Sequence, residues 1–167
     1  MSSAELKLKR AEELWIEFGP LIHRTLLSYE ADPQLREDLS QNVFLALVSA
    51  MPRIDSVLNL KAYISRIAHN VATTHVAKES RRKWVGLEEA PEDDSEDPSD
   101  AVGSQSDFDR LVRAIRRLKL PYRQVMVLLL EDFSDQEIAE IIGISHGNVR
   151  VRINRAKSQL KELMHHD

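Results

Sequence analysis

The chain has 167 residues, of which 43% are apolar, 30% charged and 5% aromatic, and it contains no cysteine. Glycine and proline are sparse, which favours an all-α fold because a β-sandwich or barrel needs many turns. The lack of cysteine excludes disulfides and thiolate metal sites, and neither a signal-peptide core nor an apolar run long enough to span a bilayer is present. We therefore expect a cytoplasmic protein that is not inserted in the membrane and holds neither a metal nor another cofactor.

The net charge of −4 conceals an uneven distribution of charge. Residues 1–86 carry 12 Lys/Arg against 10 Asp/Glu, and residues 108–167 carry 11 Lys/Arg against eight Asp/Glu. Residues 87–107 between them carry no Lys/Arg and nine Asp/Glu, with almost no large apolar side chains. Such a composition cannot bury enough apolar surface to fold, so we expect a flexible acidic linker between two mildly basic domains.

Apolar residues that recur every three or four positions predict helices throughout the N-terminal half. The first predicted helix covers residues 4–18, with Leu8 on its apolar stripe. It should end at Gly19 and Pro20, because proline interrupts the hydrogen-bonding pattern of a helix. A second, shorter helix is predicted for residues 21–29.

The next two predicted helices are longer. Asp32 and Pro33 form an N-cap followed by proline at the first helical position, and this third helix should stop at Pro52. Its wide apolar face includes Leu45, so we expect it to be the most buried helix. The fourth helix begins near Leu60 and ends in a basic tail, which suits the negative end of the helix dipole. The tail contains Lys78, Arg81, Arg82 and Lys83.

Helical periodicity resumes after the acidic segment, over residues 108–118, and Pro121 should open another helix. By periodicity alone, the apolar run of residues 125–130 could be a buried strand. A helix is the better interpretation, because helices are predicted on both sides and no partner strand is available. Two further helices, over residues 135–142 and 146–164, complete an all-α fold of two small helical domains.

These last two helices carry the local signals of a helix-turn-helix. Ser134 and Glu137 have the spacing of a capping box, which satisfies backbone N–H groups at the start of a helix. Gly143 stands where the first helix must end, and glycine tolerates the left-handed conformation of such a turn. Ser145 is a suitable N-cap for the second helix.

The second helix of this pair has a polar and basic face opposite its apolar stripe. That face carries His146, Asn148, Arg150, Arg152, Arg155 and Lys157. Arginine pairs well with guanine and asparagine with adenine, and further cations bind phosphate. The pattern predicts a helix that reads DNA in the major groove. The plainer alternative is a helical hairpin whose basic face is only solvated.

Four segments resemble motifs of one protein family. Residues 135–157, DQEIAEIIGISHGNVRVRINRAK, are similar to the C-terminal DNA-reading region of extracytoplasmic-function sigma factors, and residues 120–125, LPYRQV, resemble its lead-in. Residues 37–44, EDLSQNVF, and 60–70, LKAYISRIAHN, are similar to two motifs of the family's N-terminal domain. The motifs cover both domains in the family's order, so the chain is identified as a member of this family.

The resemblance implies a division of labour. Residues 1–86 would be sigma domain 2, which binds the β′ clamp helices of core RNA polymerase and recognises and melts the −10 promoter element. Residues 108–167 would be sigma domain 4, which grips the β flap and reads the −35 element. The family also implies promoter DNA as a partner, a free monomer or a 1:1 complex with an anti-sigma factor, and no catalytic residue.

By matching positions, the resemblance assigns contacts to three surfaces. The polymerase-binding set is Asp38, Leu39, Gln41, Asn42 and Phe44. The −10 set is Asn59, Lys61, Tyr63, Arg66, His69, Asn70, Thr73, Arg81 and Arg82. The −35 set is Ser145, His146, Gly147, Asn148, Arg150, Val151, Arg152 and Arg155. Leu39, Phe44 and Tyr63 also fit the apolar stripes of their helices, so a core position is the alternative for each.

Some residues depart from the family's pattern where bases are expected to be contacted. His69 stands in place of the usual arginine before Asn70. His146 and Asn148 replace the residues that are common at the start of the recognition helix. These departures bear on which promoter is read, not on the family.

Two other functions fit parts of the sequence. A dimeric helix-turn-helix regulator with an N-terminal helical regulatory domain would bind palindromes as a symmetric dimer, whereas a sigma factor reads an asymmetric promoter as a monomer. A helical adaptor that binds only protein would lack the salt-dependent DNA affinity expected from Arg150, Arg152 and Arg155. Catalysis has little support, because the histidines are scattered and the clustered carboxylates lie in the predicted linker.

Overall fold

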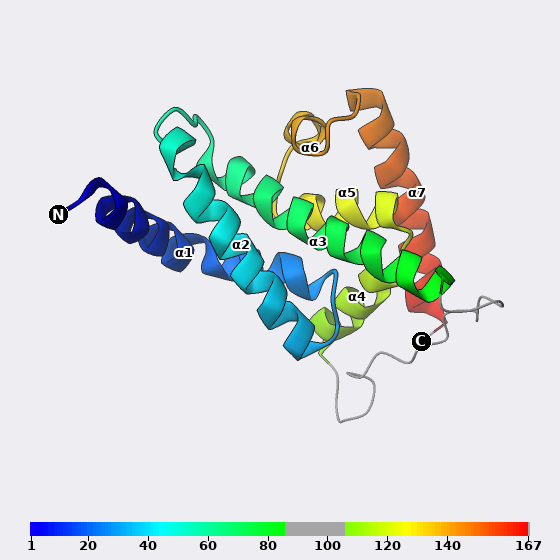
Figure 1. The fold of residues 1–167 in the computed structure, drawn as a ribbon. Helices are drawn as coiled ribbons and strands as arrows, with labels where there is room; N and C mark the ends of the chain where they lie inside the picture. The colour runs from blue at the N-terminus through cyan, green and yellow to red at the C-terminus, as the bar shows by residue number, and fades with distance from the viewer. Residues whose placement is uncertain (86–105, 167) are drawn as a thin grey trace.

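The computed structural model describes residues 1–85 and 106–166, and within these ranges it contains seven helices and no strand. The helices are α1 (Ser3–Leu27), α2 (Pro33–Ile54), α3 (Leu60–Val85), α4 (Asp107–Arg116), α5 (Leu120–Leu130), α6 (Asp135–Ile142) and α7 (His146–His165). Figure 1 shows α1–α3 in one half of the molecule and α4–α7 in the other. The predicted all-α class is confirmed. The predicted linker, residues 87–107, lies outside the described residues except for its last two positions.

None of the helices in the described part of the chain combines the length and apolarity needed to cross a bilayer.

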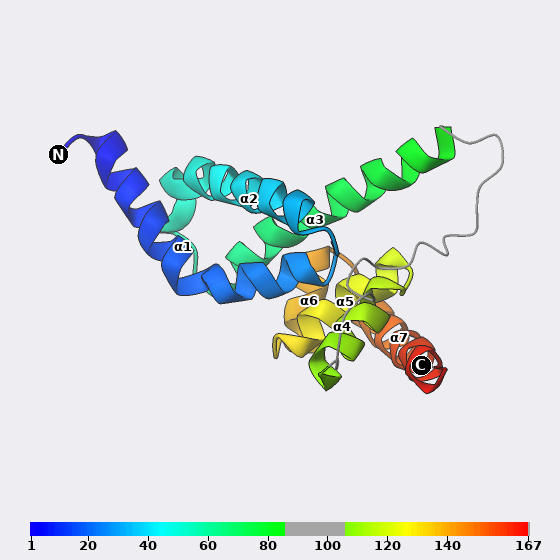
Figure 2. The ribbon, with the colours of Figure 1, turned by 90° about the horizontal axis from the view of Figure 1, so that it is seen from below.

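α1 is longer than the sequence predicted. It runs from Ser3 to Leu27, so the predicted end at Gly19 and Pro20, and the separate helix after it, are wrong. Pro20 is exposed, and Ile16, whose carbonyl loses its helical donor to the proline, is 78% exposed. Water can therefore bond that carbonyl, and the helix bends instead of ending, as Figure 2 shows.

α2 begins and ends for two different reasons. Its start is as predicted: the Asp32 carboxylate accepts a hydrogen bond from the backbone N–H of Gln34 at 2.8 Å. Its predicted stop at Pro52 is wrong, because the helix continues to Ile54 with the exposed proline in its last turn. A proline this close to the helix end removes one hydrogen bond without ending the burial of Ile54, which is 5% exposed.

The three helices of the first half pack through their apolar faces. Fully buried side chains come from each of them: Leu14 and Ile22 from α1, Val43 and Leu47 from α2, and Ile64 from α3. Each side chain of this size contributes roughly 1.5–3 kcal/mol when it is removed from water. Leu8, which was predicted on the buried stripe, lies in the second turn of α1 and is 45% exposed.

α5 is the central helix of the second half and packs against α4, α6 and α7. Residues 125–128 are all buried, so neighbours surround the helix on every side. An apolar run without clear periodicity is expected for such a helix, and the helical interpretation of residues 125–130 is confirmed. α3 packs against α6, and the buried residues of the two halves form one continuous cluster.

The predicted helix-turn-helix is present. Ser134 Oγ accepts the N–H of Glu137, whose carboxylate in turn accepts the N–H of Ser134, as in a capping box. α6 ends at Gly143, with φ +82°, and the N–H groups of Gly143 and Ile144 both donate to the carbonyl of Ala139. These bonds satisfy the carbonyl of Ala139 at the helix end and fix the direction in which α7 leaves the turn.

Replacing Gly143 by alanine should destabilise the fold by about 1 kcal/mol, because a Cβ is strained at positive φ. No atom lies within 4 Å of the Cβ that would be added, so the backbone conformation alone sets the cost. Urea unfolding followed by circular dichroism measures the change. Gly147→Ala is the matched control, since Gly147 lies in α7 without positive φ and alanine there should leave stability unchanged or raise it. Equal losses for both variants would contradict this account of the turn.

Candidate nucleic-acid interface

The N-terminal part of α7 presents most of the predicted −35 set to solvent. The exposed members are Ser145, His146, Gly147, Asn148, Arg150, Val151 and Arg155. Arg152 is half-buried. Val149, Ile153 and Ala156 form the buried stripe on the other side of the helix. The Ser145 side chain caps α7 by accepting the N–H of Asn148 at 3.2 Å, which makes Ser145 partly a structural residue.

Two side chains of this face lie beside Asp135 at the start of α6. Arg150 Nε is 3.5 Å from the Asp135 carboxylate, and His146 Nε2 is 3.8 Å from the same oxygen. At least half of each side chain is exposed, so these contacts contribute little to stability and can be exchanged for a phosphate or a base edge. Next to Arg150, the exposed Val151 offers an apolar surface of the kind that contacts a thymine methyl group.

α3 divides the predicted −10 set between two faces. The members of one group are three or four residues apart along α3, which places them on the same side of the helix. That group is Tyr63, Arg66, Asn70 and Thr73. Arg66 and Asn70 are exposed, and Tyr63 and Thr73 are half-buried, so the ring of Tyr63 also packs against the core. Arg81 and Arg82 are exposed near the C-terminal end of α3.

His69 was predicted to contact DNA, but the structure places it in the core. Its side chain is 5% exposed, and its Nδ1 lies 2.8 Å from the hydroxyl of Tyr29, just beyond α1. The two rings meet edge to face, with centroids 5.3 Å apart. On α3, the buried Ser65 lies one turn before His69 and the buried Ala72 one turn after it. We therefore assign His69 to the core and leave it out of the DNA-binding surface.

The buried His69 should make the fold sensitive to acid. Burial lowers the pKa of His69 to about 3, whereas an unfolded histidine titrates near 6.5. Below pH 6.5 the unfolded chain therefore binds a proton that the folded chain does not. The free energy of unfolding is therefore highest above that pH. It falls by about 1.4 kcal/mol per pH unit as the pH drops from there towards 3.

Urea unfolding at pH 7 and pH 5 measures this loss, for which the expected contribution of His69 is about 2 kcal/mol. His69→Gln should remove that contribution, and the exposed His23→Gln serves as the control. The comparison is between the pH dependences, so a loss of stability in His69→Gln at neutral pH does not affect it. An unchanged pH dependence in His69→Gln would contradict the burial of a neutral imidazole.

Asn59 and Lys61, two further members of the −10 set, face the second half of the molecule. Asn59 Nδ2 donates to the carboxylate of Glu137 at 3.1 Å, and Lys61 Nζ donates to the backbone carbonyl of Glu131. The Asn59 side-chain oxygen also accepts the N–H of Ala62 at the start of α3. These two side chains thus lie at the contact between the halves and not on the outward face of α3.

The predicted polymerase-binding set on α2 also divides. Asp38, Gln41 and Asn42 are exposed on one side of the helix. Leu39 is 5% exposed, and Phe44 is half-buried with its ring edge-on to Trp15 at 5.3 Å between centroids. Leu39 therefore belongs to the core, and Phe44 mainly to packing between α1 and α2.

One residue of this face was missed by the sequence prediction. Leu45 was expected on the buried face of its helix, but it is 62% exposed. It lies one turn beyond Gln41 and Asn42 and on the same side of α2. A single exposed leucine is ordinary by itself, so it is the position of Leu45 beside three exposed members of the polymerase-binding set that makes it a candidate for a protein contact. It could have been recognised only once the orientation of the helix was known.

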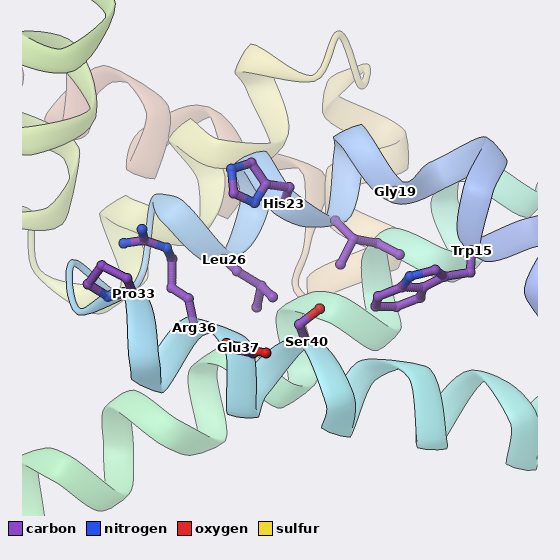
Figure 3. Close-up of a pocket in the computed structure, with 9 residues that line it drawn as sticks. Trp15, Gly19, His23, Leu26, Pro33, Arg36, Glu37 and Ser40 are labelled. Atoms are coloured by element: carbon purple, nitrogen blue, oxygen red, sulfur yellow. The ribbon is translucent and has the colours of Figure 1, made fainter.

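A groove of about 420 Å³ adjoins this face between α1 and the start of α2 (Figure 3). Its lining from α1 is Trp15, Gly19, Ile22, His23 and Leu26, and its lining from α2 is Pro33, Arg36, Glu37 and Ser40. Glu37 and Ser40 neighbour Asp38 and Gln41 on the surface of α2. The groove and the polar stripe consequently form one mixed polar and apolar surface.

Comparison with known proteins identifies both halves. Residues 14–82 match the family model of sigma-70 region 2, and residues 108–160 match that of sigma-70 region 4. The chain is 32% identical over 134 residues to the ECF RNA polymerase sigma factor ShbA of Streptomyces griseus, covering 76% of this chain and 70% of ShbA. It is 27% identical over 157 residues to the RNA polymerase sigma factor CarQ of Myxococcus xanthus, covering 92% and 88% of the two chains.

Two solved structures share the fold. CnrH, in complex with the cytosolic domain of CnrY, superposes with a TM-score of 0.67 at 20% identity, covering 98% of this chain and 96% of CnrH. The sigma factor RpoE of Bartonella quintana, in complex with the anti-sigma factor NepR, gives a TM-score of 0.70 at 24% identity, covering 95% and 99%. The similarity extends over both halves of the chain.

Proposed function

The chain belongs to the extracytoplasmic-function sigma factors of the sigma-70 family, and we propose how its surfaces share the work of promoter-specific initiation. Residues 1–86 act as domain 2 and residues 108–167 as domain 4, each built around one of the two family matches. The chain works in the cytoplasm and performs no chemistry of its own, because RNA synthesis belongs to the polymerase. The exposed basic face of α7 is the observation that carries this assignment.

Domain 4 reads the −35 element with the N-terminal part of α7. Arg150 and Arg155 are exposed cations that can pair with guanine edges or phosphates, and Asn148 can pair with adenine. Arg152, which is half-buried, is better placed to grip the backbone at the edge of the groove. The departures at His146 and Asn148 lie on the exposed surface where they can alter the preferred sequence.

Domain 2 opens the −10 element with the outward face of α3. Melting requires capture of an unstacked base, and polar groups beside an aromatic surface can provide it. Arg66 and Asn70 supply the polar groups and Tyr63 the partly exposed ring. Arg81 and Arg82 bind phosphates on the flanking duplex.

The exposed face of α2 binds core polymerase through Asp38, Gln41, Asn42 and Leu45. Three polar side chains beside one apolar side chain resemble the polar rim and apolar centre of a protein interface. Leu39 and Phe44 support this face from within the fold and do not contact the polymerase directly. Domain 4 grips the polymerase flap, as in the family.

An anti-sigma factor holds the chain inactive in a 1:1 complex. The support is that RpoE, which shares the fold over nearly its whole length, was solved in complex with the anti-sigma factor NepR. The groove beside the polymerase-binding face has the mixed lining expected of a protein contact, so a partner seated there would also block the polymerase. The nine acidic residues of the segment 87–107 further oppose binding of the free chain to DNA.

The dimeric-regulator alternative is disfavoured by the family match, and a direct experiment separates the two functions. Light scattering should give the mass of a monomer for the free chain, and the chain should co-elute 1:1 with purified core RNA polymerase in gel filtration. A dimer that binds palindromic DNA without polymerase would overturn the proposed function.

A further inference from the structure

One carboxylate lies between the two helices of the helix-turn-helix. Asp135 is the first residue of α6, and Figure 1 shows α6 next to the start of α7 across the short turn. Its Oδ2 atom is 3.5 Å from Nε of Arg150 and 3.8 Å from Nε2 of His146. His146 and Arg150 are four residues apart on α7, so they share a face of that helix. One oxygen of α6 therefore faces two members of the proposed −35 reader.

The backbone that carries Asp135 is held in place by its neighbours. The capping box between Ser134 and Glu137 fixes the first turn of α6, and the N-terminal end of a helix dipole favours a carboxylate at this position. The other carboxylate of the turn has different partners. Glu137 accepts the N–H of Ser134 at 3.0 Å and the side-chain amide of Asn59 at 3.1 Å. Asp135 is thus the carboxylate of this turn that faces α7.

The ion pair engages the Nε side of the Arg150 guanidinium. This arrangement leaves the two Nη groups at the end of the side chain for another partner. Two N–H donors at that end match the O6 and N7 acceptors of guanine. The Arg150 side chain is 67% exposed and that of Asp135 36%, so the arginine stays accessible to DNA while it is paired.

The Asp135 carboxylate also disfavours phosphate contacts. A phosphate that approaches Nε of Arg150 or Nε2 of His146 meets a negative charge already beside both groups, whereas the edge of a guanine carries no net charge. Holding a long side chain in one direction also lowers the conformational entropy that it loses on binding. The geometry consequently favours base reading over phosphate contacts, which carry no sequence information.

We propose that Asp135 is a positioning residue that sets specificity for the −35 element. It directs Arg150 towards a guanine and keeps Arg150 and His146 from binding phosphates. The inference rests on the proposed reading of the −35 element by α7. It adds a residue of α6 that acts through Arg150 and does not itself contact a base.

Asp135→Asn tests this role, because it removes the charge with little change in shape. Holoenzyme assembled from core RNA polymerase and the full-length chain would be titrated with a promoter selected by the wild type. The same promoter would then be tested with each −35 position replaced in turn. The position read by Arg150 is the guanine at which Arg150→Ala loses discrimination between bases. At that position Asp135→Asn should reduce discrimination about 3- to 10-fold, which is part of what one bidentate pair supplies.

A second readout separates positioning from damage to the fold. On the same promoter with its whole −35 element replaced, Asp135→Asn should bind about 2- to 5-fold more tightly, because Arg150 and His146 become available to phosphates. A damaged domain would bind every promoter more weakly. In an Arg150→Ala background, Asp135→Asn should change the discrimination no further, since the residue through which it acts is gone.

Two further variants complete the comparison. Asp135→Glu keeps the negative charge and should retain most of the discrimination. Glu140→Gln is the matched control, because it removes one charge from an exposed residue of α6 on a different side of the helix from Asp135. It should leave the discrimination unchanged and alter the affinity for the promoter without a −35 element less than Asp135→Asn does.

The outcomes distinguish the positioning role from the proposed function. Wild-type discrimination in Asp135→Asn at the Arg150 position, or an equal loss of affinity for all promoters, would overturn the role of Asp135 and leave the −35 reader in place. An equal effect of Asp135→Asn with and without Arg150 would overturn it as well. If Arg150→Ala altered the preference at no −35 position, the proposed recognition face would be contradicted, and the role of Asp135 with it.

Discussion

Replacing Arg150 by alanine should reduce promoter-dependent transcription about 10- to 100-fold and leave binding to core polymerase unchanged. Arg150 is exposed on the recognition helix, and its contact with Asp135 is long and open to solvent, so its loss should not unfold the domain. A good arginine–guanine pair contributes about 1–3 kcal/mol of discrimination, which sets the expected range. Abortive or run-off transcription measures the effect on a promoter selected by the wild-type chain, and labelled core polymerase measures binding.

Lys161→Ala is the matched control for this variant. Lys161 is an exposed cation on the same helix, but it lies three turns beyond Arg150, outside the part of α7 that enters the groove. It should reduce transcription by less than about twofold at physiological salt. Equal losses of transcription and of polymerase binding in Arg150→Ala would show that the recognition face has been assigned wrongly.

Replacing Leu45 by aspartate should weaken binding to core polymerase by about 10-fold or more. Leu45 is 62% exposed beside Asp38, Gln41 and Asn42, so the free protein loses little burial when it is replaced. In the complex a charge would be desolvated against the polymerase, which is costly without a partner. The affinity follows from titration of labelled chain with core polymerase, and urea unfolding of the free chain reports its stability.

The control substitution is Leu58→Asp. Leu58 is fully exposed in the loop between α2 and α3, outside the proposed polymerase-binding face, so the same chemical change should leave the affinity for core polymerase unaltered. If Leu58→Asp weakened binding as much as Leu45→Asp, the exposed face of α2 would not be the specific contact that we propose.

Local signals allowed the helix-turn-helix to be predicted from sequence almost residue by residue. Ser134, Glu137, Gly143 and Ser145 occupy the predicted capping and turn positions. Capping and turn chemistry depend on neighbours within about four residues, so a sequence window contains all the information needed. Helical periodicity is likewise a property of a short stretch of sequence, which is why the exposed and buried sides of α7 agree with those predicted.

Tertiary packing determined the features that the sequence did not reveal. Pro20 looked like a helix end, but it faces solvent, where the lost hydrogen bond can be replaced by water. His69 looked like a DNA contact, but its partner Tyr29 is 40 residues away and covers it. Leu45 was predicted to be buried with the rest of the apolar face of its helix. The sequence does not show which part of a wide apolar face lacks a packing partner, and Leu45 lies in such a part.

The contact between the domains is the clearest case of information absent from local sequence. Arg24 and Glu131 are 107 residues apart, and each alone looks like an ordinary charged surface residue. Asn59 and Lys61 likewise bond to Glu137 and Glu131 of the other domain, although the resemblance assigned them to DNA.

Genomic run-off transcription tests the central claim most directly. Purified core RNA polymerase would transcribe fragmented genomic DNA with and without the chain, and start sites would be mapped by sequencing. We expect the chain to produce starts at a limited set of sites that share one element near −35 and another near −10, and Arg150→Ala to lose those starts. The account would be contradicted if the purified chain bound core polymerase but gave the same start sites as core polymerase alone.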